Sequence, residues 1–236
     1  MADAHLGLHP EEDPERIRTI LSFFAHVKER RGDLFIMGDF FDFWFEYRSV
    51  IPKRHFEILA AMKDLTSSGV KVIYIGGNHD FWIGDFLRRE IGLRAFTGSA
   101  ELVSQGRRMY LAHGDGLAQR DPLYPLLRGL LHSRPVTALY GLLHPDLGLP
   151  LARCFSRLSR SYNTDWAPDS EKLWIDVALP RFRAGFDAVI LGHIHKPLEI
   201  TREGKSLFVL GDWIWRFSYL VLTDGAFQQL RWKTEG

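Results

Sequence analysis

The sequence is poor in cysteine and contains no long hydrophobic run. Its 236 residues include a single cysteine, Cys154, which excludes an intramolecular disulfide and a zinc site built from several thiolates. So little cysteine is typical of a reducing compartment. The apolar runs fall short of the roughly 18 to 20 residues that a membrane-spanning helix needs, and the first residues do not form a basic and then apolar signal segment. We therefore expect a cytoplasmic protein.

Net charge is also nearly absent. Thirty basic residues balance 29 acidic residues, which leaves a formal net charge of +1. Because binding to a polyanion requires an extended basic surface, and no long basic stripe is visible, we do not expect nucleic acid as a partner. The 46% of apolar residues and 25% of charged residues are typical of a globular protein. The length allows one large core, or one core with a smaller cap.

Short apolar runs alternate with helical patterns along the first half of the chain and return near its end. The runs predict buried strands at 33–37, 70–75, 107–112 and 188–191, and later strands at 206–210, 219–222 and 228–232. Apolar residues at helical spacing predict helices at 17–30 and 55–65. Strands interleaved with helices are typical of an α/β sheet, which places function at the carboxyl ends of the strands.

The middle of the chain has a different pattern. From residue 121 to 179 the apolar spacing is helical, repeated prolines divide it into short pieces, and strand patterns vanish. We therefore predict a helical cap at 121–179, inserted into a core that comprises 1–120 and 180–236. The cap is rich in leucine, and up to Asp165 its arginines outnumber its acids. It is either an apolar groove with cationic rims that suits an anionic amphiphile, or an ordinary packed cap with a solvated basic face.

Aspartate, asparagine and histidine residues gather where the predicted strands end, beside glycines. The segments are Asp3-Ala-His5, Gly38-Asp39-Phe-Phe-Asp42, Gly77-Asn78-His79-Asp80, His113-Gly-Asp115 and Gly192-His193-Ile-His195. Strand-end turns of an α/β sheet converge on one crevice, so these side chains are expected to meet despite their separation in the chain. Glycine beside a donor lets the backbone turn sharply at the rim.

The donor types indicate a class of metal. Carboxylate, amide oxygen and imidazole, without thiolate, suit Mn²⁺, Fe²⁺, Zn²⁺ or Mg²⁺. The donors are too many for one ion, whereas two ions about 3.5–4 Å apart, bridged by a carboxylate, would use them all. Such a pair suits in-line displacement at phosphorus. The sequence therefore predicts two divalent metal ions, with Mn²⁺ as the expected metal.

The five segments together resemble the signature of the calcineurin-like metallophosphoesterase superfamily. The resemblance implies an α/β fold in which helices flank a β-sandwich and the helical cap is an insertion. It implies one metal ion on Asp3, His5, Asp39 and His195, and a second on Asp39, Asn78, His113 and His193, with Asp39 bridging. It also implies that His79 faces the phosphate, where it stabilises charge or protonates the leaving group, and that Asp42 orients His79.

Further motifs are similar to the UDP-2,3-diacylglucosamine pyrophosphatase family of lipid A synthesis. They are Gly38-Asp-Phe-Phe-Asp-Phe-Trp44, Phe43-Trp-Phe-Glu-Tyr47, Gly77-Asn-His-Asp-Phe81, His113-Gly-Asp-Gly-Leu117 with Tyr124, His144-Pro-Asp146, Gly192-His-Ile-His-Lys-Pro197 and Leu210-Gly-Asp-Trp213. The resemblance implies that water attacks the α-phosphorus of a nucleotide-linked glycolipid and gives UMP and 2,3-diacylglucosamine 1-phosphate (lipid X). With the substrate in a membrane, peripheral contact with the inner membrane surface is an open expectation.

Substrate contacts are expected in the cap, because the family's cap contacts the substrate. The candidates for that contact are Tyr124, Arg157, Ser159 and Arg160. Leucine and aromatic residues of the cap would take the acyl chains, since each buried methylene contributes roughly 0.8 kcal/mol. For Arg157 and Arg160 the alternative interpretation is a solvated helix face.

Two other functions stay open, as does the oligomeric state. A metallophosphoesterase that acts on another nucleotide or small phosphodiester would need a shallower and more polar groove, so the leucine-rich cap favours the lipid substrate. A non-catalytic binding scaffold on the same fold is disfavoured, because the expected ligands and His79 are all present.

The start of the chain departs from the family pattern. In the family a short strand leads to Asp-x-His, whereas only Met1 and Ala2 precede Asp3 here. If that strand is absent, we expect Asp3 and His5 to lose their scaffold and the first metal ion to bind weakly.

Overall fold

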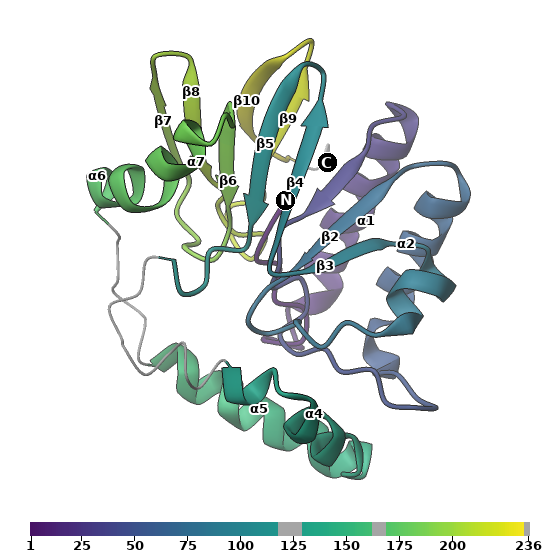
Figure 1. The fold of residues 1–236 in the computed structure, drawn as a ribbon. Helices are drawn as coiled ribbons and strands as arrows, with labels where there is room; N and C mark the ends of the chain where they lie inside the picture. Colours follow the sequence, from purple (N-terminus) through teal and green to yellow (C-terminus); the bar gives the residue numbers. More distant parts are fainter. Residues whose placement is uncertain (118–128, 162–168, 234–236) are drawn as a thin grey trace.

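Two β-sheets pack face to face and carry helices on their outer faces (Figure 1). The structure is a computed structural model that describes residues 1–117, 129–161 and 169–233, with the backbone alone at 153, 155 and 157–161. A sandwich of sheets flanked by helices, with further helices inserted between strands, is the predicted architecture, and the α/β class is confirmed.

The first sheet is parallel and three-stranded. Its strands lie in the order β1 (Leu34–Ile36), β2 (Val72–Gly76) and β3 (Arg94–Thr97). The helices around these strands are α1 (Asp13–Glu29), η1 (Lys53–His55), α2 (Phe56–Ser67) and η2 (Phe86–Ile91). Apolar residues of α1 and α2, among them Phe23 and Ile58, pack with Tyr74 of β2 in one buried cluster. The two helices therefore close the outer face of this sheet.

The second sheet is mixed and five-stranded. Its order is β4 (Ser99–Ser104), β5 (Arg107–Ala112), β6 (Ala188–Leu191), β8 (Lys205–Val209) and β7 (Leu198–Arg202). Because β5, β6 and β8 run parallel, their carboxyl ends meet at one edge. The helices that precede β6 are α6 (Ser170–Lys172), η3 (Leu173–Ala178) and α7 (Leu179–Arg183), of which α6 and η3 lie within the proposed cap bounds 121–179. Leu173 and Trp174 of η3 pack on the outer face of this sheet.

Strands β2 and β6 are buried on both faces. In β2, Tyr74 belongs to the cluster beneath the helices, while Ile73 and Ile75 belong to the cluster between the two sheets. In β6, Ile190 lies between the sheets and Val189 packs with η3. Side chains alternate across a strand, so burial on both faces requires a continuous apolar run. Such runs are why both strands were predictable from sequence.

Strands β3, β4 and β7 are absent from the predicted elements. All three lie at the edges of their sheets. An edge strand is only partly covered, and charged residues such as Arg94, Glu101 and Glu199 interrupt its apolar pattern. The late strands are confirmed: the run at 206–210 corresponds to β8, and those at 219–222 and 228–232 form a separate antiparallel hairpin of β9 (Ser218–Thr223) and β10 (Ala226–Arg231).

The cap helices α4 (Arg134–Gly141) and α5 (Pro145–Ser161) lie below the sheets in Figure 1. Aromatic contacts attach them to the core. The Tyr140 ring of α4 lies 5.7 Å from Phe43, 4.7 Å from Phe45 and 5.1 Å from Trp82, measured between ring centroids. The boundaries 121–179 stay a proposal. Within the described part of the chain, no helix has the length and hydropathy needed to cross a membrane.

Candidate metal centre

The segment that carries Asp3 and His5 lies beside the end of β1. The backbone N–H groups of Asp3 and His5 donate hydrogen bonds to the carbonyl oxygens of Gly38 (3.1 Å) and Asp39 (2.9 Å). Residues 1–5 form no strand, yet both side chains are buried and fixed beside Asp39. The expectation that Asp3 and His5 lose their scaffold is wrong, because these backbone hydrogen bonds hold the segment beside β1 although residues 1–5 form no strand.

Five of the predicted metal ligands have left-handed backbone conformations. Their φ angles are positive at Asp3 (55°), His5 (43°), Asp39 (50°), His193 (69°) and His195 (59°). Residues other than glycine rarely adopt this region, and each instance costs on the order of 1–3 kcal/mol. Strain concentrated at donor residues indicates a site whose geometry is held by the surrounding fold.

Glycines let these strained loops approach one another. A Cβ atom at Gly38, whose φ is 89°, would lie 2.4 Å from Nδ1 of His113. A Cβ atom at Gly77 would lie 2.2 Å from Oδ1 of Asp39. Only glycine fits at these two positions, because any side chain would displace His113 or Asp39.

The candidate ligands form three sets, and Asp39 belongs to two of them. The sets are Asp3, His5 and His195; His5, Asp39 and His79; and Asp39, His113 and His193, with donor atoms within 4.8 Å of one another in each set. Oδ2 of Asp39 lies 3.6 Å from Nε2 of His5 and 3.2 Å from Nε2 of His113. One carboxylate oxygen thus faces both sides of the cluster, which is the position that a carboxylate bridging two cations requires.

Hydrogen bonds orient the His113 and His193 residues. Nδ1 of His113 lies 2.8 Å from the Met37 carbonyl oxygen, which only accepts, so this nitrogen carries the proton. Nε2 of His113 is then left to face the cluster, 3.2 Å from Oδ1 of Asn78. The backbone N–H of His193 donates to the carboxylate of Asp3. This arrangement is typical of a metal ligand whose second ring nitrogen is held by the protein.

The His5 ring tests whether a metal ion fits the site. Both its nitrogens are buried and have no hydrogen-bond partner among the described residues. Leaving buried polar atoms without partners is costly, whereas a cation between His5, Asp3 and Asp39 would meet one of them. The donors are carboxylates, imidazoles and an amide oxygen, which suit Mn²⁺, Fe²⁺, Zn²⁺ or Mg²⁺. The residues present therefore fit divalent cations.

The carboxyl groups of Asp3 and Asp39 differ in how readily they ionise. Burial raises the pKa of Asp3 to about 7. Burial also disfavours the ionised form of Asp39, but the His113 and His79 rings beside it hold the pKa of this carboxyl well below its usual range. Asp39 is therefore ionised at neutral pH, whereas Asp3 is only partly ionised there.

The two C-terminal histidines prefer the neutral form. Burial, together with the neighbouring His113, lowers the pKa of His193 to about 4. Burial, together with the neighbouring His5, lowers the pKa of His195 to about 3. Neutral imidazole is the form that binds a metal ion. Both rings are thus ready to ligate at neutral pH.

His79 is held by Asp42 and by a residue of the cap. The backbone N–H of His79 donates to Oδ1 of Asp39 at 2.9 Å, and Nδ1 lies 3.0 Å from the Asp42 carbonyl oxygen. The Asp42 carboxylate is farther from Nδ1, at 3.9 Å. Ser156 of α5 donates to that carboxylate at 3.1 Å, and its Oγ lies 3.1 Å from Nδ1 of His79. The carbonyl of Asp42 thus orients His79, while its carboxylate joins the core to the cap.

Ser156 is a site residue that the sequence interpretation missed, whereas Asp80 was expected to be a loop partner rather than a ligand, and the structure confirms this. Buried Asp80 accepts hydrogen bonds from the backbone N–H groups of Asp39, Phe40, Phe41 and Gly77 and from the Tyr74 hydroxyl. Asp80 therefore ties the loop of Asp39 to the loop of His79. The only sequence signal for Asp80 is its place in the Gly77–Asp80 motif, and Ser156 has none beyond its place beside Arg157.

Comparison with known proteins agrees with this centre. The family model described as calcineurin-like phosphoesterase matches residues 1–197 of the chain. This chain belongs to the calcineurin-like phosphoesterase family.

Relatives of this calcineurin-like phosphoesterase match almost all of its length. The chain is 30% identical to the UDP-2,3-diacylglucosamine hydrolase of Porphyromonas gingivalis, with 95% of this chain and 93% of the relative covered. It is 33% identical to the protein of the same name from Pseudomonas paraeruginosa, with 90% and 89% covered. A solved archaeal phosphodiesterase aligns with 98% of each chain at 11% identity and a TM-score of 0.47, a likeness too low to carry an argument.

The predicted substrate contacts lie where side chains are not described. Tyr124 is outside the described residues, and for Arg157, Ser159 and Arg160 the structure describes only the backbone of α5. Their roles in this phosphoesterase stay predictions. Ser156, on the same helix, shows that this part of α5 reaches the metal centre.

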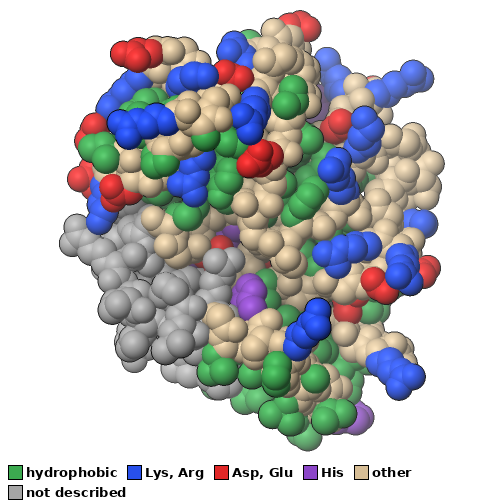
Figure 2. All heavy atoms as spheres, in the orientation of Figure 1, with side chains coloured by type: hydrophobic (Ala, Val, Ile, Leu, Met, Phe, Trp, Pro, Cys, Tyr) green, Lys and Arg blue, Asp and Glu red, His purple; other side chains and the backbone are tan. Residues whose placement is uncertain are grey.

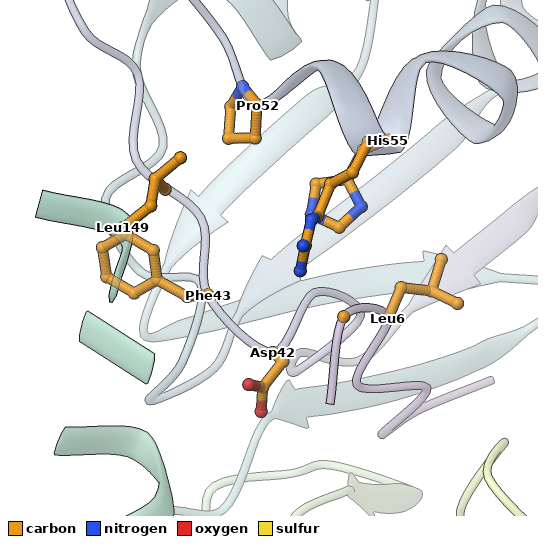
Figure 3. A pocket seen from close by; sticks show the side chains of 8 residues that line it. Leu6, Asp42, Phe43, Pro52, His55 and Leu149 are labelled. Carbon is orange, nitrogen blue, oxygen red and sulfur yellow. The ribbon is translucent and has the colours of Figure 1, made fainter. Parts of the chain in front are cut away.

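A pocket adjoins the metal centre at Asp42, between the core and the cap (Figure 3). Its lining residues are Leu6, Gly7, Asp42, Phe43, Pro52, Arg54, His55 and Leu149. Figure 3 shows Leu149 of α5 close to Phe43 of the core, with Asp42 nearby. The apolar lining of the pocket therefore begins at Phe43, the residue directly after Asp42, whose carbonyl oxygen orients His79.

Proposed function

We propose that this phosphoesterase hydrolyses the pyrophosphate of UDP-2,3-diacylglucosamine, by attack of water on the α-phosphorus, to UMP and 2,3-diacylglucosamine 1-phosphate. The observation that carries the proposal is the Asp39 carboxylate, one oxygen of which faces histidines on both sides. The substrate is taken from the names of the relatives that match nearly the whole chain.

The proposed ligands are the residues that surround Asp39. One ion would be held by Asp3, His5, Asp39 and His195, and the other by Asp39, Asn78, His113 and His193. When bound, two divalent cations supply positive charge to the phosphate oxygens and lower the pKa of water, with Mn²⁺ as the proposed metal and Fe²⁺, Zn²⁺ or Mg²⁺ as alternatives. Within this set Asp3 must lose its proton, because its pKa is about 7 without the cations.

His79 would act at the phosphate rather than as a ligand. Its Nδ1 contacts the Asp42 carbonyl oxygen, which only accepts, so Nδ1 carries a proton. Its Nε2 points to the cluster, 4.0 Å from Oδ2 of Asp39. A proton on Nε2 can be donated to a phosphate oxygen or to the leaving group. Asp42 and Ser156 keep the ring in that orientation.

The cap would bind the acyl chains and the surface of the membrane that holds them. The exposed leucines of the cap include Leu139, Leu142, Leu147 and Leu151, which are between 44% and 83% exposed. Figure 2 shows hydrophobic side chains over the lower part of the molecule, where the cap lies. Apolar surface of this kind marks a binding site for a lipid or another apolar partner. Tyr124, Arg157, Ser159 and Arg160 would contact the polar part of the substrate.

The experiment incubates the purified chain and Mn²⁺ with UDP-2,3-diacylglucosamine and measures UMP release. A simple phosphodiester is the competing substrate, and the same reaction with a chelator is the control. The proposal expects UMP from the lipid nucleotide and little cleavage of the simple ester. Efficient cleavage of the simple ester with the lipid nucleotide left intact would instead support a phosphodiesterase of another substrate class.

A further inference from the structure

The loop between β8 and β9 is organised around one buried carboxylate. Asp212 is 1% exposed. It accepts hydrogen bonds from the backbone N–H groups of Ile214 (3.1 Å), Trp215 (2.6 Å) and Arg216 (3.1 Å), and from the Arg216 guanidinium (2.6 Å). Four donors on one carboxylate fix the backbone of this short loop, since hydrogen bonds to an ionised acceptor are the stronger ones.

The same loop is joined to the metal centre. The backbone N–H of Trp213 donates to the carbonyl oxygen of Asp3 at 3.0 Å. Nε2 of His195 lies 3.6 Å from Oδ1 of the same Asp3. The loop therefore borders the Asp3–His195 part of the centre, whereas the cap reaches the Asp42–His79 part through Ser156.

Trp215 is the large side chain that this fixed loop leaves in solvent. Its side chain is 57% exposed, while the neighbouring Trp213 is fully buried. The backbone carbonyl oxygen of Trp215 accepts a hydrogen bond from the Arg231 guanidinium. The imidazole ring of His9 lies 6.3 Å from the Trp215 indole, measured between ring centroids. A tryptophan exposed on a fixed backbone, in a loop that is hydrogen-bonded to Asp3, loses little conformational entropy when a flat ligand covers it.

We propose that Trp215 is the stacking platform for the uracil base of the substrate. The inference rests on the proposed function. A lipid nucleotide has an apolar end and a planar, aromatic end on either side of its pyrophosphate. The exposed leucines of the cap suit the acyl chains, and the cap contacts the centre at Asp42 and His79. The exposed indole suits the base, and its loop contacts the centre at Asp3.

The experiment measures the affinity of two soluble probes for the Mn²⁺-loaded full chain by calorimetry. UMP carries the base, whereas ribose 5-phosphate has the same sugar phosphate without it. Trp215→Ala should weaken UMP binding about tenfold, which is the scale of base stacking on an aromatic side chain. The affinity for ribose 5-phosphate should not change. Trp215→Phe should restore most of the UMP affinity. Ile175→Ala, which trims an exposed apolar side chain of η3, is the matched control and should change neither.

The outcomes separate this inference from the proposed function. Equal effects of Trp215→Ala on both probes, or no effect on either, overturn the stacking role, and they do so even if the wild type cleaves the lipid nucleotide. A loss of vesicle binding in Trp215→Ala with UMP affinity intact also overturns it, in favour of a membrane anchor. A wild type that binds UMP through Trp215 without cleaving the lipid nucleotide supports the inference and rejects the proposed hydrolysis.

Discussion

The metal centre and the cap differ in how firmly their side chains are held. Asp3, His5, Asp39 and His113 are at most 2% exposed, and hydrogen bonds from distant loops fix their backbones. The helix α4 of the cap has no buried residue, and Leu142 beyond its end is 83% exposed. The candidate metal ligands thus lie in a buried, hydrogen-bonded part of the molecule, whereas the exposed leucines lie in the cap, where α4 has no buried residue.

The metal centre and the cap meet different physical requirements. Holding two like-charged cations and a phosphate demands donor positions set to a fraction of an ångström, which buried and strained loops provide. Binding flexible acyl chains demands apolar area rather than exact positions. The regions meet at Ser156 and at the Tyr140 aromatic contacts. Changes in the centre should therefore abolish metal binding or chemistry, and changes in the cap should alter substrate affinity.

The largest effect is expected from Asp39→Ala. Because Oδ2 of Asp39 faces both His5 and His113, both metal ions should be lost together, and hydrolysis with them. The loss of affinity should exceed the roughly 10–100-fold that removal of an outer partner of a metal ligand costs. Metal content after gel filtration measures it, with the exposed Asp176→Ala as control. Two retained equivalents would contradict the bridging role.

His79→Ala should separate chemistry from metal binding. If His79 acts at the phosphate, kcat should fall by about 10²–10⁴-fold, the usual contribution of a general acid, while two metal ions remain bound. Steady-state kinetics with metal analysis checks this, and the exposed His144→Ala is the matched control. Loss of one metal equivalent in His79→Ala would place His79 among the ligands instead, in the set that it forms with His5 and Asp39.

Metal affinity should rise as the pH increases from about 6 to 8. Burial raises the pKa of Asp3 to about 7, and the Asp39 carboxylate raises the pKa of buried His113 well above its usual range despite the opposing effect of burial. Both groups hold protons in the metal-free protein at pH 6 and must release them to ligate. Each proton released changes affinity by about tenfold per pH unit. Calorimetry in two buffers of different ionisation enthalpy measures the release; affinity that is flat over this range rejects it.

Ser156→Ala tests the contact between the two regions. Removing the hydroxyl deletes the hydrogen bond to the Asp42 carboxylate and the 3.1 Å contact with Nδ1 of His79, and leaves the Asp42 carbonyl oxygen as the remaining partner of Nδ1. One such bond is worth about 0.5–1.5 kcal/mol, so kcat should fall by about 2–10-fold and the pH profile of kcat should shift, with metal content unchanged. Ser156→Thr, which keeps the hydroxyl, should restore the rate. An unchanged kcat and pH profile in Ser156→Ala would mean that the cap does not act on His79.

The smallest effect is expected from Leu142→Ser on the cap. Removing one exposed apolar side chain should raise KM for the lipid nucleotide by a few-fold, since full burial of a leucine contributes only about 1.5–3 kcal/mol. Hydrolysis of a simple phosphodiester should not change. Val103→Ser on β4, similarly exposed but remote from the cap, is the control. A drop in the rate on both substrates would show that the cap governs the centre rather than the lipid.

Much of the core was predictable because its strands are buried on both faces. The apolar runs at 107–112 and 188–191 match β5 and β6 residue for residue. The edge strands β3, β4 and β7 were not predictable, since charged residues on these half-exposed strands interrupt their apolar pattern. The start of the chain also escaped prediction, because the segment of Asp3 and His5 is held by hydrogen bonds to 38–39 rather than by a strand of its own.

The sequence by itself determined the donor set. Carboxylates, imidazoles and an asparagine at strand ends, beside glycines, specify divalent cations through their chemistry alone. Only the tertiary structure decided which residues support that set. Asp42 and Ser156 are 114 positions apart, and His193 and Asp3 are 190 apart. Contacts between such distant residues leave no local periodicity in the sequence, because they arise only when separate loops converge at one edge of the sheets.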